Sequence, residues 1–238
     1  RNNLNYYMTQ LHKMNDTTKI MMRLAAIAGL ALASSANAAT TITVLNASFE
    51  DTDVADGTAG ATPASWTGTG AVGTQDFNTS GATGHLPVAT DGEQHAYTNG
   101  TNNGLGTLSQ VTGHTIVAGE TYTLTVDVGQ VHAFSGSEAR IWFFGDTGGV
   151  GTNFAENAGI VANNQGLYLV DQTVTFTAGA GEAGQSLGVA ISGGTNTDPG
   201  TRQVLFDNVR LEFDVVPEPS SAALLGLGGL ALIFRRRK

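Results

Sequence analysis

The chain has 238 residues and carries 20 acidic against 11 basic side chains, a formal net charge of −9. It contains no cysteine, so no disulfide framework can stabilise it. Most of the basic residues lie near the two ends, because residues 39–216 hold three cations against 18 acids. Such an acidic stretch repels phosphate backbones, which excludes nucleic acid as a predicted partner.

The first 38 residues divide into a polar leader and a secretory signal. Residues 1–20 show no hydrophobic pattern, and we interpret them as an upstream or non-native leader. Residues 21–38 combine a positive charge at Arg23, an apolar run over Leu24–Ala33 and the small residues Ala36 and Ala38. This layout predicts a signal-peptide helix that is cleaved after Ala38. A membrane anchor that stays on the protein is the alternative.

Residues 39–216 alternate apolar and polar side chains, which is the pattern of β-strands with one buried face. The strand candidates are Thr41–Leu45, Gln94–Thr98, Gly106–Val111, Thr121–Val128, Arg140–Phe144, Tyr168–Phe176, Leu187–Ile191 and Leu205–Phe213. Long polar loops are expected over 51–63, 68–86 and 146–165. Many short strands without an amphipathic helix predict one all-β domain, an antiparallel jelly-roll β-sandwich.

The last residues, 217–238, form a separate unit. A Pro217-Glu218-Pro219 triplet leads into an uncharged apolar run, Ala222–Phe234, and the chain closes on four cations, Arg235, Arg236, Arg237 and Lys238. The run is shorter than the ~20 residues of a comfortable membrane span, and the cations favour the cytoplasmic side. An ordinary C-terminal anchor or a buried core helix are the alternatives.

This order of triplet, short apolar segment and basic end resembles the PEP-CTERM sorting signal of bacterial exported proteins. The resemblance implies a short hydrophobic transmembrane helix, which is recognised and cut near Pro217 by an exosortase-type membrane protease. It also implies a transient intermediate in the inner membrane, followed by release to the cell surface or the extracellular matrix.

Two short motifs bracket the middle domain. Leu45-Asn46-Ala47-Ser48-Phe49-Glu50 stands near its start, and Leu205-Phe206-Asp207-Asn208-Val209-Arg210-Leu211 near its end. Together they resemble jelly-roll carbohydrate-binding modules of the galactose-binding-like sort. The resemblance implies a polysaccharide ligand, and a structural calcium that joins the first and last strands through Glu50 and Asp207. Calcium prefers such hard oxygen ligands.

Asp207 is the most informative single residue of the middle domain. It shares its strand parity with Leu205, Val209 and Leu211, so its carboxylate is expected to face the core. A buried carboxylate must be compensated, which the calcium would do. The alternatives are a bulge at Asp207 and Asn208 that turns the carboxylate outward, and hydrogen bonds from loop amides.

Two aromatic residues are candidate sugar platforms. Trp66 lies in a polar Thr-Gly loop, and Tyr97 lies close to Asn99. Trp66 closing one end of the sandwich is the alternative. Trp142 alternates with Ile141 and Phe143 and is expected in the core.

The motifs that suggest catalysis lack their structural context, and the sequence predicts no enzyme. The G-x-G-x-x-G patterns at 68–73 and 179–184 open no helix, and the G-x-S-x-G pattern at 184–188 leads into a strand. Asp146-Thr147-Gly148 occurs once, whereas an aspartic protease needs two facing carboxylates. The prediction is a non-enzymatic exported surface or matrix protein that associates with exopolysaccharide. A secreted polysaccharide-active hydrolase and a purely structural or adhesive protein are the alternatives.

Overall fold

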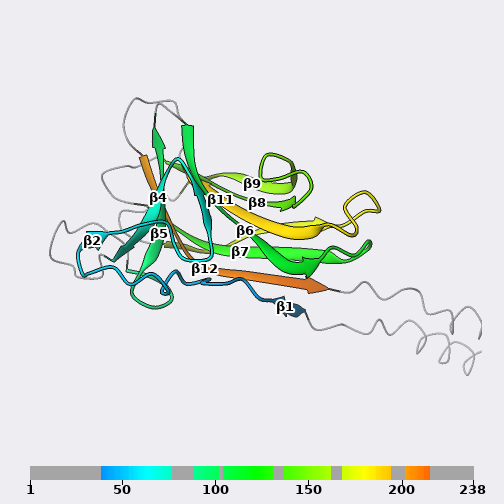
Figure 1. Cartoon of the computed structure of the whole chain (residues 1–238), viewed down its shortest axis with the longest axis horizontal. Helices are drawn as coiled ribbons and strands as arrows, with labels where there is room; N and C mark the ends of the chain where they lie inside the picture. Colours follow the sequence, from blue (N-terminus) through cyan, green and yellow to red (C-terminus); the bar gives the residue numbers. More distant parts are fainter. Residues whose placement is uncertain are drawn as a thin grey trace, which may run out of the picture. The chain divides into compact units, whose positions relative to one another are not determined.

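The computed structural model describes residues 39–76, 88–101, 104–130, 137–161, 168–193 and 202–214, which form strands and turns (Figure 1). The predicted leader, the signal helix and the C-terminal hydrophobic helix lie outside these residues. Within the described ranges, no helix has the length and apolar character to cross a membrane.

The strands form an antiparallel sheet that folds into two layers. The first layer has the order β10 (Tyr168–Thr177), β7 (Thr121–Gln130), β12 (Arg202–Asp214), β5 (His95–Thr101) and β4 (Ala71–Asp76). The second has the order β3 (Thr67–Thr69), β6 (Gly104–Thr115), β11 (Ser186–Gly193), β8 (Glu138–Gly145) and β9 (Asn153–Val161). β1 (Thr40–Ile42) pairs with β12, and β2 (Thr58–Ala59) pairs with β4. The predicted all-β sandwich is confirmed.

Apolar side chains on the inner faces of both layers form one core. β7 contributes Leu124, Val126 and Val128 from one layer, while β8 and β11 contribute Ile141, Phe143, Val189 and Ile191 from the other. Burial of each such side chain stabilises the fold by roughly 1.5–3 kcal/mol. The alternation read from the sequence is therefore the alternation of core and surface.

Three regions predicted as loops contain strands. β9 lies within 146–165, β4 lies within 68–86 with β3 overlapping the start of that range, and β2 lies within 51–63. β9 and β3 are largely exposed, and β4 begins with small side chains. Without a regular row of large apolar residues, these strands carry no alternation for sequence analysis to detect.

Two β-bulges shift the parity that the sequence suggested. In β10 the register shifts between Leu169 and Gln172, around Asp171 with its positive φ of 57°, and Val170 is 56 % exposed. In β12 it shifts between Asp207 and Arg210, around Asn208 with a φ of 50°. The core-facing row of β12 is accordingly Val204, Phe206, Val209 and Leu211. The predicted row with Leu205 and Asp207 facing the core is wrong, because the extra residue of the bulge puts both on the outer face.

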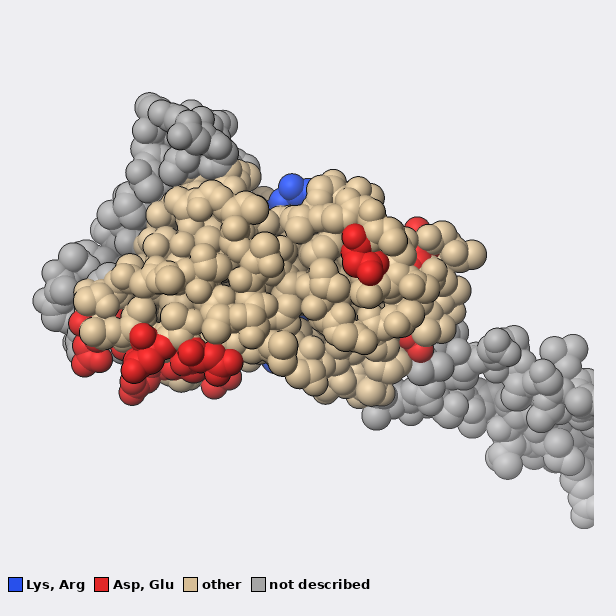
Figure 2. All heavy atoms as spheres, in the orientation of Figure 1, with Lys and Arg blue, Asp and Glu red and all other residues tan. Residues whose placement is uncertain are grey.

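Acidic side chains cluster on part of the described surface. Figure 2 shows acidic side chains gathered near one corner of the face in view, where few basic side chains appear. Asp51, Asp53 and Asp56 are exposed on the segment that precedes β2, and Asp91 is exposed on the loop before β5.

Candidate functional site

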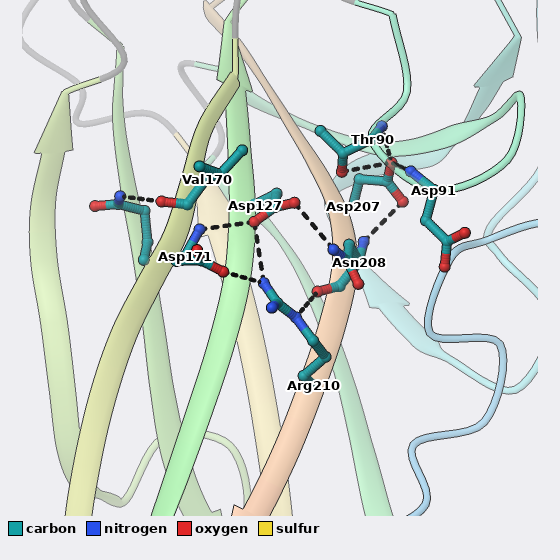
Figure 3. Close-up of polar contacts among 9 residues, drawn as sticks. Thr90, Asp91, Asp127, Val170, Asp171, Asp207, Asn208 and Arg210 are labelled. Carbon is teal, nitrogen blue, oxygen red and sulfur yellow. Dashed lines mark hydrogen bonds and ion pairs between the residues drawn. The ribbon is translucent and has the colours of Figure 1, made fainter.

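Asp207 is completely buried, and it holds the loop of residues 88–94 (Figure 3). Its Oδ2 accepts hydrogen bonds from the Thr90 amide at 2.6 Å, the Thr90 hydroxyl at 3.0 Å and the Asp91 amide at 2.9 Å. Its Oδ1 accepts one from the Asn208 amide at 2.7 Å. Burial raises the pKa of Asp207 to about 6, against these hydrogen bonds, which lower it.

Glu50 holds the other end of the same loop. Its Oε1 accepts hydrogen bonds from the Glu93 amide at 2.8 Å and the Gln94 amide at 2.7 Å. Gly92 is required here, because its φ is +83° and a Cβ atom would lie 2.4 Å from Glu50 Oε1. The structure thus brings the two predicted calcium ligands to one loop.

The donor set for calcium is only partial. In the described ranges no three acidic or histidine side chains are grouped so that they could hold a metal. Amide hydrogens already point at Asp207 Oδ2 and Glu50 Oε1, so a cation bound to these atoms would compete with them. The predicted alternative, hydrogen bonding by loop amides, accounts for both carboxylates as they stand.

A second buried carboxylate, Asp127 of β7, fastens the two bulges on either side of it (Figure 3). It accepts hydrogen bonds from the Asp171 amide at 2.8 Å and from Asn208 Nδ2 at 3.1 Å. An Arg210 guanidinium nitrogen lies 3.2 Å from Asp127 Oδ1 and 2.7 Å from Asp171 Oδ1. Sequence reasoning missed this network, because Asp127 looked like one of several polar residues on the solvent side of its strand.

The outer face of the first layer presents a tyrosine and two amides side by side. Tyr97, Asn99 and Gln203 are half-buried, and Asn99 pairs directly with Gln203 across β5 and β12. The Tyr97 ring lies over Gly73, where a Cβ atom would approach it to 2.7 Å. The Asn99 side-chain oxygen is buried and has no hydrogen-bond partner among the residues that the structure describes. A buried acceptor of this kind is uncommon.

His95 lies on the same face, next to Tyr97 in the outward-facing row. Burial lowers the pKa of His95 to about 4, so its imidazole is neutral at pH 7. Its Nε2 is 2.9 Å from the Gln75 side-chain nitrogen. A neutral ring in this place adds hydrogen-bonding capacity to the face without adding charge.

The structure buries both tryptophans. Trp66 is 6 % exposed, packs 5.4 Å from the Phe49 ring, and donates from Nε1 to the Asn46 carbonyl at 3.2 Å. It closes one end of the core and lacks the exposed ring face that a sugar platform needs. Trp142 is buried as expected, but outside the main core, on the outer face of the second layer under the Arg140 guanidinium.

The remaining predicted site residues lie outside the described residues. These are the cleavage residues Ala36 and Ala38 and the sorting residues Pro217, Glu218, Pro219, Arg235, Arg236 and Arg237.

Comparison with family models assigns both parts of the chain. A model described as HpiC1 cyclase matches residues 40–212, and a model of the PEP-CTERM protein-sorting motif matches residues 215–238. The second match confirms the predicted sorting motif. A comparison with curated proteins finds no match.

Solved structures share the fold. The Stig cyclase FisC from Fischerella sp. TAU, in complex with (3Z)-3-(1-methyl-2-pyrrolidinylidene)-3H-indole, is 22% identical with a TM-score of 0.61, and the alignment covers 75% of this chain and 100% of that one. A cyclase from Fischerella sp. TAU in complex with 4-(1H-indol-3-yl)butan-2-one is 21% identical with a TM-score of 0.59, covering 75% and 100%. The CBM22-1 xylan-binding domain from Paenibacillus barcinonensis Xyn10C is 18% identical with a TM-score of 0.44, covering 77% and 100%.

Proposed function

We propose that this chain, which belongs to the HpiC1 cyclase family and ends in a PEP-CTERM sorting motif, is a non-enzymatic surface or matrix protein that binds polysaccharide. The sorting motif marks the chain for export. An exosortase-type protease removes the C-terminal segment near Pro217, after a transient stage in the inner membrane. The processed domain, residues 39–216, then associates with exopolysaccharide.

The observation that carries the binding proposal is the outer face with Tyr97, Asn99 and Gln203. An aromatic ring stacks on the apolar face of a sugar, and amide side chains pair with adjacent hydroxyl groups. The Asn99 and Gln203 side chains are both half-buried, so their amide groups lie at the surface beside the Tyr97 ring. Because residues 39–216 carry 15 more acids than cations, we expect a neutral polysaccharide and not an anionic one.

The carboxylates that fasten other segments support a role without catalysis. Asp207, Glu50 and Asp127 each accept hydrogen bonds from backbone amides of another segment. A carboxylate whose oxygens fasten a loop is poorly placed to exchange protons with a substrate. Calcium at Glu50 and Asp207 stays part of the proposal as a structural ion, which would bind the two carboxylates in place of the loop amides.

The test is retention of residues 39–216 in gels that contain neutral polysaccharides. Tyr97→Ala should weaken binding about fivefold, since an aromatic contact contributes ~1 kcal/mol. Tyr97→Phe keeps the ring and should bind almost as the wild type does, and Val170→Ala, at an exposed site on β10, is the matched control. Equal retention of wild type and Tyr97→Ala would contradict this site, and no retention of the wild type by any neutral polysaccharide would contradict the function.

A second candidate function is cyclisation of an indole compound. The family match favours it, as do the two Fischerella structures that hold indole ligands. Asp207, whose pKa burial raises to about 6, lies on β12 two residues beyond Leu205, the pairing partner of Tyr97, and it could donate a proton only after its oxygens exchanged the loop amides for a substrate. Calorimetric titration with 4-(1H-indol-3-yl)butan-2-one distinguishes the two functions. Indole binding that Tyr97→Ala abolishes, together with no polysaccharide retention, would favour the cyclase.

A further inference from the structure

The two ends of the described domain leave it side by side. β1 and the end of β12 are paired, with Thr40 opposite Phe213, Thr41 opposite Glu212 and Ile42 opposite Leu211. Pro217 of the sorting motif follows Asp214 by three residues, which span at most about 11 Å. The segment to be processed therefore begins directly beyond a paired strand.

The end of β12 pairs with β7 on one side and with β1 on the other, and β7 is much more firmly held than β1. On one side β7 is fixed between β10 and β12, with Tyr122 and Leu124 fully buried. On the other side β1 has three residues, of which Thr40 and Thr41 are exposed and only Ile42 is buried. Beyond β1, both backbone groups of Leu45 are hydrogen-bonded by the Gln110 side chain, which limits any opening to the residues before Leu45.

Proteins that recognise extended peptides commonly add a strand to an open sheet edge. The edge of β12 at 211–213 precedes Pro217 by four residues in the sequence, and the short β1 covers this edge. Removal of β1 exposes unpaired backbone groups that a partner strand can use. We propose that the membrane-bound processing protease binds this edge of β12 as an added strand, displacing β1, before it cuts near Pro217.

The inference rests on the proposed removal of the C-terminal segment, and the lack of cysteine in the chain makes it testable. In a full-length Thr41→Cys/Glu212→Cys variant, the two cysteines face each other across an antiparallel pair. Their Cα atoms lie about 4.5–5.5 Å apart, within the range of a disulfide. Thr123→Cys/Thr175→Cys is the matched control, because it links β7 to β10 in the same layer and leaves β1 free.

Each precursor, oxidised or reduced, is incubated in detergent with membranes of the producing bacterium, and loss of the C-terminal segment is followed by mass spectrometry. The oxidised β1–β12 variant should be processed at least about tenfold more slowly than its reduced form, the factor that 1.4 kcal/mol of added opening cost gives. The oxidised control should match the wild type. Ile42→Ala, which weakens β1, should be processed faster than the wild type.

Equal rates for the oxidised and reduced β1–β12 variant would overturn the inference, as would equal slowing by the control disulfide. A wild-type precursor that keeps its C-terminal segment would overturn the proposed processing itself, and this inference with it.

Discussion

The buried carboxyl of Asp207 predicts an unusual dependence of stability on pH. Its pKa in the folded domain is about 6, against an ordinary 3.8, because burial disfavours the charged form. The folded state therefore binds more protons than the unfolded state between about pH 4 and pH 6. The contribution of Asp207 to stability therefore falls as the pH rises through that window and is greatest below it.

The magnitude follows from the two pKa values. At 1.36 kcal/mol per pKa unit, ionisation of Asp207 removes roughly 2 kcal/mol of unfolding free energy between pH 4, where the unfolded carboxyl is already partly ionised, and pH 7. Asp207→Asn cannot titrate and loses this dependence. It also turns an NH₂ group toward the loop amides or leaves them unpaired, at roughly 1–3 kcal/mol for each buried donor left without a partner.

The assay is urea denaturation of wild type and Asp207→Asn at several values between pH 4 and pH 7, in the presence of a chelator. The stability difference between the two proteins should shrink by roughly 2 kcal/mol across the range. A difference for Asp207→Asn that does not change with pH would refute the reasoning from burial.

The same experiment in millimolar calcium tests the predicted metal. A bound cation favours the ionised carboxylate, so the slope would reverse and wild-type stability would rise with pH. Identical curves in calcium and chelator would contradict a calcium site at Glu50 and Asp207, and amide hydrogen bonding would then be the whole compensation of Asp207.

Arg210→Gln should destabilise the domain by about 1–2 kcal/mol in urea denaturation, because it leaves the buried Asp127 without its cation, and a value near zero would contradict a role for this pair. Trp66→Ala should cost about 3–5 kcal/mol as a core deletion, and a change below 1 kcal/mol would restore it as a candidate surface platform. The native extracellular protein should begin at Ala39 and end near Pro217, and an intact Lys238 in its mass spectrum would contradict the processing.

Sequence reasoning succeeded where strands bury one face. In β7, large apolar residues at 122, 124, 126 and 128 define the core face without reference to any partner strand. In β9 most side chains are exposed, and no such row exists. The short strands were not predicted, because backbone pairing fixes their place in the sheet and the alternation of their side chains does not reveal that pairing.

The site residues could be chosen from the sequence, but not their roles. Parity predicted Asp207 on the core face, and one extra residue at the bulge reversed it. Asn at the bulge was the available signal, since Asn adopts a positive φ more readily than other residues with side chains. Three of the four donors to Asp207 lie 116 or 117 positions away, in a loop whose path nothing near Asp207 encodes. The local sequence pattern identifies candidate site residues, whereas their hydrogen-bond partners are known only once the fold is known.

A cysteine-free exported domain must fasten its loops without disulfides, and this chain uses carboxylates that accept hydrogen bonds from other segments. Glu50 and Asp207 close the loop before β5, and Asp127 ties two bulges across three strands. Unlike a disulfide, these fastenings do not depend on the oxidation state, and the one at Asp207 depends on pH, because burial raises its pKa to about 6. The acidic side chains of the exposed surface thus differ in role from Glu50, Asp127 and Asp207. That division explains how an acidic domain can be stable, and it places the sensitivity to pH at Asp207, where burial is complete.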